Sequence, residues 1–217
     1  MKLRASLAAF IILIVILGDQ IIKYVVKTSM NLYDKIHVTD WFYIFFTENH
    51  GMAFGMDFIG TGVLTVFRIL AVVFFVYYLL KQIRLLAPIG FLVCLSLIIA
   101  GAAGNIIDNS LYGLCFTESL PYAGVTSFPA RCVPLGEGYG SFLHGHVVDM
   151  FYFPLFRWPE WVPFLGGGTF FGAVFNLADA AISCGAAAMI LFYYRYVSNL
   201  LGGKNTETPP LEKDSES

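Results

Sequence analysis

Two aspartates stand in strongly apolar surroundings. Asp149 follows Val147 and Val148 at the start of an aromatic stretch, Asp179 lies in an apolar segment nearer the C-terminus, and neither has a cation close by in sequence. If the fold brings the two carboxyl groups together, they can share one proton. The ionised member can then take a proton from water while the neutral member donates to a carbonyl oxygen, so the pair is a candidate for hydrolysis without a nucleophilic side chain.

Two asparagine and aspartate pairs have helical spacing. Asn105 precedes Asp108 by three residues and Asn176 precedes Asp179 by three, so each pair lies on one face of a helix. The ordinary interpretation of such carboxylates is helix capping or a structural ion pair. We expect Asp108 at the C-terminal end of a helix, where its charge opposes the helix dipole. Because capping does not explain it, we expect it to orient a neighbouring group.

Asp19 and Lys23 lie four residues apart in the first apolar segment. Ionisable groups inside such a segment cost several kcal/mol unless they are paired or hydrated. The spacing puts the acid and the base on one helix face, so we interpret them as a structural ion pair.

Other polar residues give weaker support for chemistry. His144 and His146 lie two residues apart, but a metal needs a third ligand, so we expect no metal and no cofactor. Ser96 and Ser183 have no histidine nearby in sequence, which argues against a serine mechanism.

The composition predicts a membrane protein. The chain has 217 residues, of which 58% are hydrophobic and 13% charged, against about 25% charged in soluble domains. A net charge of -2 without clustered Lys and Arg argues against a nucleic-acid partner. Apolar blocks of about 20 residues each suffice to cross a bilayer. We therefore expect an all-α membrane bundle of four transmembrane helices, within one domain over residues 1–200, with spans at about 5–26, 62–80, 88–107 and 172–194.

The charges predict the topology. The first span is not expected to be a cleaved signal peptide, because its apolar pattern resumes after Asp19 and no small-x-small cleavage site follows. The positive-inside rule places both termini in the cytoplasm. It rests on basic residues that flank one side of the spans, which are Lys2, Arg4, Lys81, Arg84, Arg195 and Lys204.

The two long connections, at about 28–61 and 109–171, must then face outward. Residues 36–46 and 147–156 are rich in β-branched and aromatic side chains, which predicts a small periplasmic β-sheet at the outer membrane surface. The tail at 203–217 is polar and is predicted to be disordered.

Three further features concern packing and redox state. The small residues at 101–104 and 185–188 allow close helix approach. Arg68, near the outer end of the second span, is expected to extend toward lipid headgroups rather than to clamp a loop. Cys115 and Cys132 lie in an outer loop, where a disulfide persists and would stabilise by roughly 3 kcal/mol. Unpaired thiols are the alternative.

Five motifs together resemble the lipoprotein signal peptidase (signal peptidase II) family. They occur in order across the four spans, and together they cover most of residues 10–195. The motifs are D-Q-I-I-K at 19–23, N-H-G-M-A-F-G at 49–55, G-A-A-G-N-I-I-D at 101–108, V-V-D-M at 147–150 and F-N-L-A-D-A at 175–180.

The resemblance implies an aspartic endopeptidase of the bacterial inner membrane with Asp149 and Asp179 as catalytic residues near the periplasmic face. Its implied substrate is a diacylglyceryl-modified prolipoprotein, cut just before the lipidated cysteine. The expected partners are these substrates and membrane lipids, and we expect a monomer. The implied residues that bind substrate or support the site are Asp19, Lys23, Asn49, Gly51, Gly104, Asn105, Asp108, Asn176 and Ala178.

The chain departs from the family pattern in two ways. The family usually has an arginine after the aspartate of the third motif, where this chain has Asn109. The role of that arginine can fall to Arg68, Arg131 or Arg157, and the sequence does not choose among them. The outer connections on both sides of Asp149 are also longer than is typical of the family, so they carry insertions that can cap the site or contact a partner.

Two other functions compete with the peptidase. Intramembrane Asp, Asn and Lys residues also build ion pathways, so a small proton-coupled membrane transporter is the main alternative. No internal repeat supports it, and Asp149 is expected on an outer loop rather than at the midplane. A scaffold protein whose polar residues join helices is the other alternative.

Overall fold

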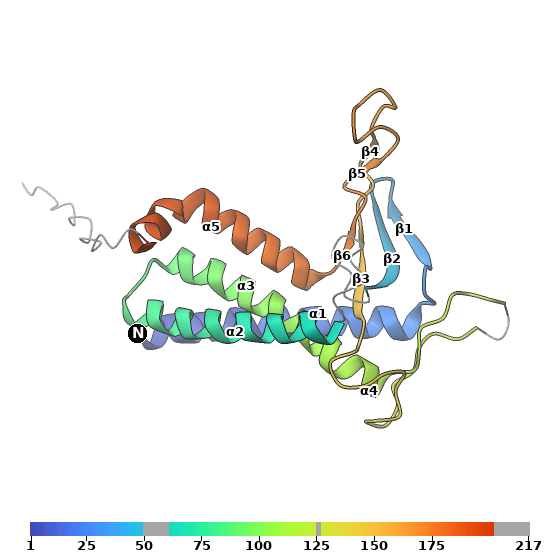
Figure 1. Ribbon diagram of the computed structural model, residues 1–217, viewed down its shortest axis with the longest axis horizontal. Helices are drawn as coiled ribbons and strands as arrows, with labels where there is room; N and C mark the ends of the chain where they lie inside the picture. Colours follow the sequence, from blue (N-terminus) through green and yellow to red (C-terminus); the bar gives the residue numbers. More distant parts are fainter. Residues whose placement is uncertain (50–60, 125–126, 202–217) are drawn as a thin grey trace, which may run out of the picture.

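Four long apolar helices run side by side and meet a small sheet at one end (Figure 1). The computed structural model describes residues 1–49, 61–124 and 127–201. The helices are α1 (Lys2–Ser29), α2 (Thr61–Arg84), α3 (Ile89–Ile107) and α5 (Leu177–Leu201), and all four are long and apolar enough to cross a membrane. The expectations for Gly51 and for the tail at 203–217 fall outside the described residues.

The third helix extends beyond the end that the sequence predicts. After α3 the chain continues through a π-helical turn, η1 (Asp108–Tyr112), into the short α4 (Gly113–Cys115). α3 itself ends where expected, with Asp108 as its C-terminal cap residue, but Asp108 does not end the helical path. The polar residues that suggested a loop are buried, because they bond to other parts of the protein instead of to water. Single π turns of this kind often occur at functional sites.

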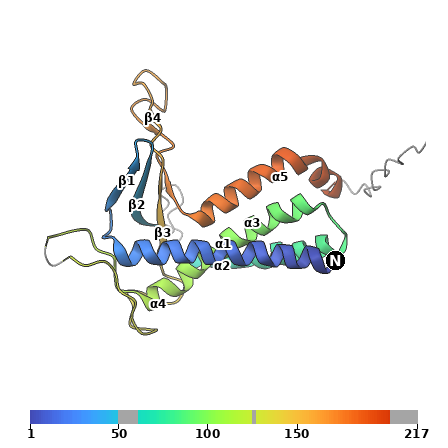
Figure 2. The ribbon, with the colours of Figure 1, turned by 180° about the vertical axis from the view of Figure 1, so that it is seen from behind.

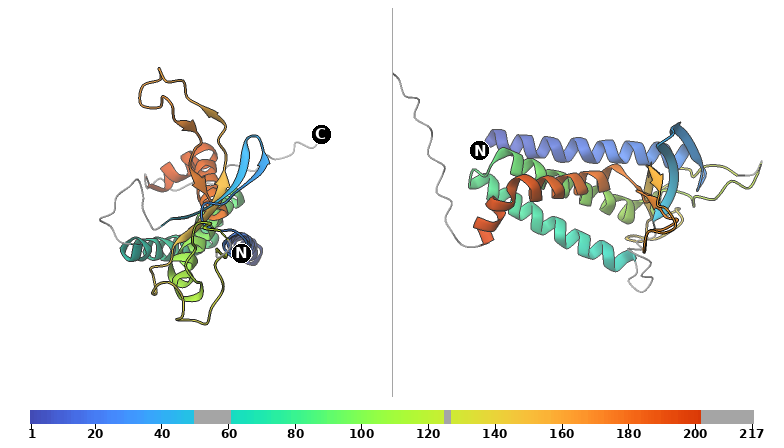
Figure 3. Two further views of the ribbon diagram at one scale, coloured as in Figure 1. Left: turned by 90° about the vertical axis from the view of Figure 1, so that its right-hand side faces the viewer. Right: turned by 90° about the horizontal axis from the view of Figure 1, so that it is seen from above.

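The fourth helix begins later than the predicted span, which started near residue 172. Residues just before it form a strand, β6 (Val174–Phe175), and α5 starts after Asn176. Figure 3, seen from above, shows that the N-terminus and the end of α5 both lie at the end of the bundle opposite the sheet. The bundle thus has one end with the N-terminus and the end of α5 and another with the sheet.

The helix α3 lies at the centre of the bundle. In its most apolar stretch 56% of the residues are buried, against 11 to 17% for the other three helices. Glycines allow this close packing. A Cβ atom on Gly101 would lie 2.2 Å from the Ala178 carbonyl oxygen, and one on Gly104 would lie 2.8 Å from Asp19 Oδ2. The expectation for this run of small residues is confirmed.

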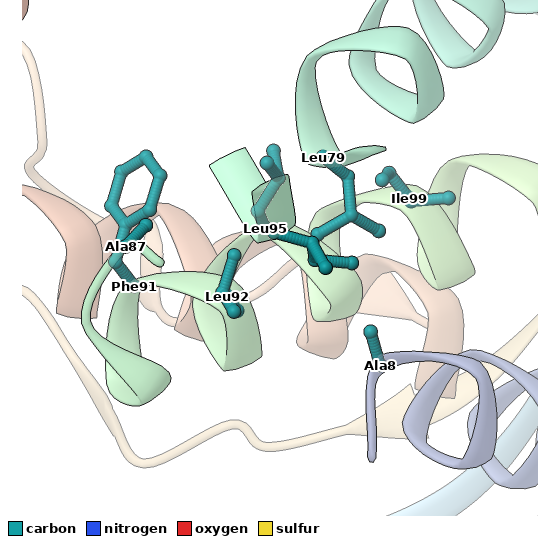
Figure 4. Close-up of a cluster of buried hydrophobic side chains, with 8 residues drawn as sticks. Ala8, Leu79, Ala87, Phe91, Leu92, Leu95 and Ile99 are labelled. Carbon is teal, nitrogen blue, oxygen red and sulfur yellow. The ribbon is translucent and has the colours of Figure 1, made fainter. Parts of the chain in front are cut away.

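Apolar side chains fill the helix bundle toward the end that holds the termini (Figure 4). Phe91, Leu92 and Leu95 of α3 are at most 2% exposed and pack against Leu79 of α2 and Ala8 of α1. No ionisable side chain belongs to this cluster. The polar groups that could do chemistry are therefore separated from it, at the other end of the bundle.

The sheet is antiparallel and has four strands in the order β1-β2-β3-β6, from β1 (Lys35–Thr39) through β2 (Phe42–Asn49) and β3 (Val147–Tyr152) to β6. The register places Thr47 opposite Asp149, and it shifts between Ile44 and Thr47. Such bulges re-aim side chains beside active sites. A second pair, β4 (Phe156–Arg157) and β5 (Thr169–Phe170), forms a hairpin that projects away from the bundle (Figure 1).

A buried polar network anchors the long segment between α4 and β3 to the rest of the fold. Lys27 of α1, which is 0% exposed, forms an ion pair with Glu48 of β2 and donates to Ser119 Oγ at 2.8 Å. Nδ1 of His146 lies 3.0 Å from Glu48 Oε2. Burial alone would raise the pKa of Glu48, but the hydrogen bond with His146 and the charge of Lys27 outweigh it and lower the pKa to about 2. The carboxylate therefore stays ionised in the fold.

Cys115 and Cys132 lie close together in the backbone pairing but are free thiols in the structure. The Val133 amide donates to the Cys115 carbonyl oxygen at 2.8 Å, and Phe116 forms a bridge with Cys132. The disulfide between them is not present in the structure and stays a prediction.

Candidate active site

The two aspartates singled out in the sequence come together where the helices meet the sheet. Asp149 lies on β3 and is 5% exposed, and Asp179 lies in the first turn of α5. The amide of Asn176 joins them, because its Nδ2 donates to Asp149 Oδ1 at 2.6 Å while its Oδ1 accepts from the Asp179 backbone amide at 2.8 Å. The fold thus brings together carboxylates that are distant in the chain.

The spacing of Asn176 and Asp179 makes them a reciprocal cap on α5. Besides the bond above, Asp179 Oδ2 accepts from the Asn176 backbone amide at 3.4 Å, which is the pattern of a capping box. Asp19 of α1 adds a second cap, since its Oδ1 accepts from the Ala178 amide at 2.9 Å. These bonds satisfy amides that helix geometry leaves unpaired, and they fix the position of Asp179.

Asn105 on α3 connects the dyad to the buried charges. Its Nδ2 donates to Asp179 Oδ1 at 2.8 Å, and its Oδ1 accepts from Asn176 at 3.2 Å and from Lys23 Nζ at 2.9 Å. One amide thus contacts the catalytic candidate on α5, the bridging asparagine and the lysine. The three-residue spacing of Asn105 and Asp108 correctly indicated a shared direction.

Lys23 is paired more extensively than the sequence predicted. Its Nζ lies 2.9 Å from Asp19 Oδ2, as expected, and 2.7 Å from Asp108 Oδ2. The interpretation of Asp19 and Lys23 as a self-sufficient pair on one helix is therefore incomplete, because one lysine serves two carboxylates. Asp108 also accepts from the Val148 backbone amide at 3.4 Å, beside Asp149, in line with its expected role of orienting a neighbour.

Gln20 is a supporting residue that sequence reasoning missed. Its Nε2 donates to Asp108 Oδ1 at 2.8 Å and to Asp19 Oδ2 at 3.1 Å, and its Oε1 accepts from the Tyr112 hydroxyl at 3.2 Å. Asp19 and Asp108 together carry one more charge than Lys23 can balance, and the side-chain amide of Gln20 adds hydrogen bonds to both carboxylates. The available signal was its position directly after Asp19 in the first motif.

The electrostatics of Asp149 suit one half of an acid–base pair. Burial raises its pKa, and the nearby charge of Asp179 adds to the shift, while the hydrogen bond from Asn176 and the charge of Lys23 oppose it. The balance brings the pKa of Asp149 to about 7. At neutral pH this carboxyl group is therefore poised between its two protonation states, as a group that must both hold and release a proton requires.

The three candidate arginines lie in different surroundings. Arg68 of α2 is half-buried, and its Nη1 donates to Asn109 Oδ1 at 2.7 Å. The expectation that Arg68 extends to headgroups is wrong, because the side chain turns into the protein. Arg131 instead packs on the Phe128 ring at 5.2 Å, and Arg157 is exposed on β4.

An apolar cavity opens beside Asp179. It has a volume of about 470 Å³, and its lining includes Phe171, Phe175, Ala180 and Cys184. Asn49, at the end of β2, pairs with Val147 two residues before Asp149, which places it at the same edge of the sheet. Together these features give a carboxylate pair with an apolar space next to it.

A pair of carboxyl groups at the end of a four-helix membrane bundle defines a membrane hydrolase of the aspartic type. Comparison with known proteins gives the family. The signal peptidase (SPase) II family model matches residues 11–195. The chain belongs to the signal peptidase II family.

Curated relatives agree with this assignment. A lipoprotein signal peptidase of Porphyromonas gingivalis is 46% identical over 218 residues, covering 98% of this chain and 94% of that protein. A lipoprotein signal peptidase of Amoebophilus asiaticus is 34% identical, covering 83% of this chain and 75% of that protein. Two solved bacterial membrane enzymes share the fold, with TM-scores of 0.59 and 0.57 at 21% and 24% identity. They cover 94% and 86% of this chain, and 95% and 91% of their own chains.

The shared lysine leads to a stability prediction. Lys23→Met should lower the melting temperature of the detergent-solubilised protein strongly, because two buried carboxylates lose their cation, a loss of about 3–5 kcal/mol for a broken buried pair. Adding Asp19→Asn alone should restore little, since Asp108 stays unpaired. Adding Asp108→Asn as well should restore more. A full return of the melting temperature in the Lys23→Met, Asp19→Asn variant would contradict the pairing of Lys23 with both Asp19 and Asp108.

Proposed function

We propose that the protein removes the signal peptide from diacylglyceryl-modified prolipoproteins by cutting before the lipidated cysteine, with Asp149 and Asp179 as the catalytic pair. The observation that carries this proposal is that Asn176 contacts both carboxyl groups, because its Nδ2 donates to Asp149 Oδ1 and its backbone amide donates to Asp179 Oδ2. The relatives named lipoprotein signal peptidase support the substrate class. The apolar cavity beside Asp179 suits a substrate with a lipid and an apolar signal segment.

The proposed chemistry assigns opposite protonation states to the pair. Asp149, whose pKa is raised to about 7 by burial and the charge of Asp179, holds the proton. Asp179 takes a proton from the attacking water while Asp149 donates to the carbonyl oxygen of the scissile peptide. As the tetrahedral intermediate collapses, its hydroxyl group returns a proton to Asp149 and re-forms the carbonyl. The carbon–nitrogen bond breaks, and Asp179 passes the proton taken from water to the leaving amine, so both carboxyl groups regain their starting states. Asn105 and Asn176 hold the carboxylates in place throughout.

We propose that the site faces the periplasm and that both termini face the cytoplasm. Figure 2 shows that α1 begins and α2 ends at the end of the bundle opposite the sheet. Lys2 and Arg4 lie at the start of α1, and Lys81 and Arg84 lie in the last turn of α2, as the positive-inside rule requires of a cytoplasmic end. One copy of the chain supplies both aspartates and both bridging asparagines, which supports a monomer. The proposed membrane domain covers residues 1–200. The transporter alternative is not supported by the family match. Asp149 lies on β3 of the sheet and Asp179 lies in the first turn of α5, which supports a site where the helices meet the sheet rather than at the middle of the bundle.

The direct experiment compares two substrates that differ only in lipidation. Purified protein is incubated with a diacylglyceryl-modified prolipoprotein and, separately, with the unlipidated form of the same prolipoprotein. The products are identified by mass spectrometry. We expect cleavage before the modified cysteine in the first and much slower cleavage in the second. Equal cleavage of both would contradict the proposed specificity, and no cleavage of either would contradict the peptidase.

The pKa of Asp149 gives a pH dependence. If Asp149 must carry the proton, activity should fall as the pH rises through about 7, its pKa in the fold. Activity should also fall at acidic pH, where the partner carboxylate becomes protonated. The profile of kcat/KM should therefore be bell-shaped, and activity that rises steadily from pH 6 to about 9 would contradict the assignment.

A further inference from the structure

Arg68 is a charged residue in an otherwise apolar stretch of α2 whose burial needs an explanation. Lys81 and Arg84 lie at the end of the same helix, where they reach water, but Arg68 lies among Val, Phe, Ile and Leu residues. A charge at such a position costs several kcal/mol unless it has a use or a partner. Its side chain is half-buried and points toward the site.

The guanidinium is held in a fixed position by a residue that is itself fully buried. Asn109 accepts from Arg68 through Oδ1 at 2.7 Å, and its Nδ2 donates to the Gly145 carbonyl oxygen at 2.7 Å. The Gly145 amide in turn donates to the Asn109 carbonyl oxygen at 2.8 Å. Asn109 is thus clamped between η1 and the segment leading into β3, and it orients the arginine.

Within the described part of the chain, Arg68 forms no ion pair. Among the described residues every buried salt bridge involves Lys23, Lys27 or His146, and none involves Arg68. Its positive charge acts on Asp179, Asp108 and Asp149 from a greater distance. A guanidinium has five N–H donors, and the described contacts use one of them. By these described contacts, the remaining donors are available on a side chain whose charge acts on both aspartates of the pair.

We propose that Arg68 is the positioning cation of this active site, with donors that bind a backbone carbonyl oxygen of the substrate peptide and a charge that favours the ionised member of the aspartate pair. This inference rests on the proposed function. The cation comes from α2 and not from residue 109, where asparagine serves as its holder. An arginine is suited to this role because its planar, fixed set of donors loses little freedom on binding.

The effect of removing Arg68 on the pH profile depends on the other charged groups around the aspartate pair. Lys23 of α1 also faces the aspartates, while Asp19 and Asp108 offset its charge. Removing the guanidinium leaves the pair with less positive charge nearby. The ionised carboxylate then binds its proton more readily, so the acidic limb of the pH profile should move to higher pH.

The first test compares Arg68→Ala with Arg157→Ala, an exposed arginine on the β4–β5 hairpin, in the lipidated-prolipoprotein assay. We expect Arg68→Ala to lower kcat/KM by roughly ten- to hundredfold, as for loss of a hydrogen bond to a charged group, and to shift the acidic limb upward. Arg157→Ala should leave both unchanged. Wild-type activity in Arg68→Ala would overturn the inference while leaving the peptidase assignment intact.

A second variant keeps the test valid if Arg68→Ala is unstable. Arg68→Ala with Asn109→Arg supplies a guanidinium to the same space from η1 and should recover much of the lost kcat/KM and return the acidic limb toward its original pH. Arg68→Lys should recover the pH limb more than the kcat/KM, because it restores the charge without the planar donors. Loss of activity in Arg68→Ala with an unshifted limb and no recovery in the double variant would show a merely structural role and overturn the proposal.

Discussion

The arrangement of the site depends on one buried lysine. Lys23 is fully buried and lies between Asp19 and Asp108, and each of these carboxylates also accepts from a backbone amide next to one of the two proposed catalytic aspartates. Asp19 holds Ala178, adjacent to Asp179, and Asp108 holds Val148, adjacent to Asp149. Both aspartates of the pair are thus positioned through two buried carboxylates whose negative charge Lys23 offsets.

The same interaction explains why small residues are needed at the helix crossings. Gly104 lets Asp19 approach α3, since a side chain there would overlap the carboxylate, and Gly101 lets α3 approach the start of α5. The result is a rigid polar layer between an apolar bundle and an antiparallel sheet. Asparagines in this layer supply hydrogen-bond donors and acceptors without adding charge. They therefore lower the free-energy cost of burying the polar groups.

Much of this site could be predicted from the sequence, because helical spacing determines which side chains share a face. The intervals from Asn105 to Asp108 and from Asn176 to Asp179 correctly indicated residues that act together. The second partner of Lys23 could not be predicted, because it depends on how α1 and α3 are rotated against each other. The continuation of α3 past residue 107 was missed for a related reason: polar residues suggest a loop unless their buried partners are known.

The inward direction of Arg68 also depends on packing between helices distant in the chain. A lone arginine near the end of an apolar span is compatible with a headgroup contact or with an internal one, and its partner Asn109 stands where a different residue type was expected. The position of the long segment between α4 and β3 also could not be predicted from the sequence. Its polar residues predict a loop, but its attachment through Lys27 and Glu48 is a property of the fold.

The most direct measurement of the central claim is cleavage of lipidated prolipoprotein by purified Asp149→Asn and Asp179→Asn variants. Asparagine keeps the shape of each side chain but cannot exchange the proton that the mechanism requires. The account predicts that both variants fold, with melting temperatures near that of the unmodified protein, and that neither gives detectable product. Substantial turnover by either folded variant would contradict the aspartate pair as the catalytic centre.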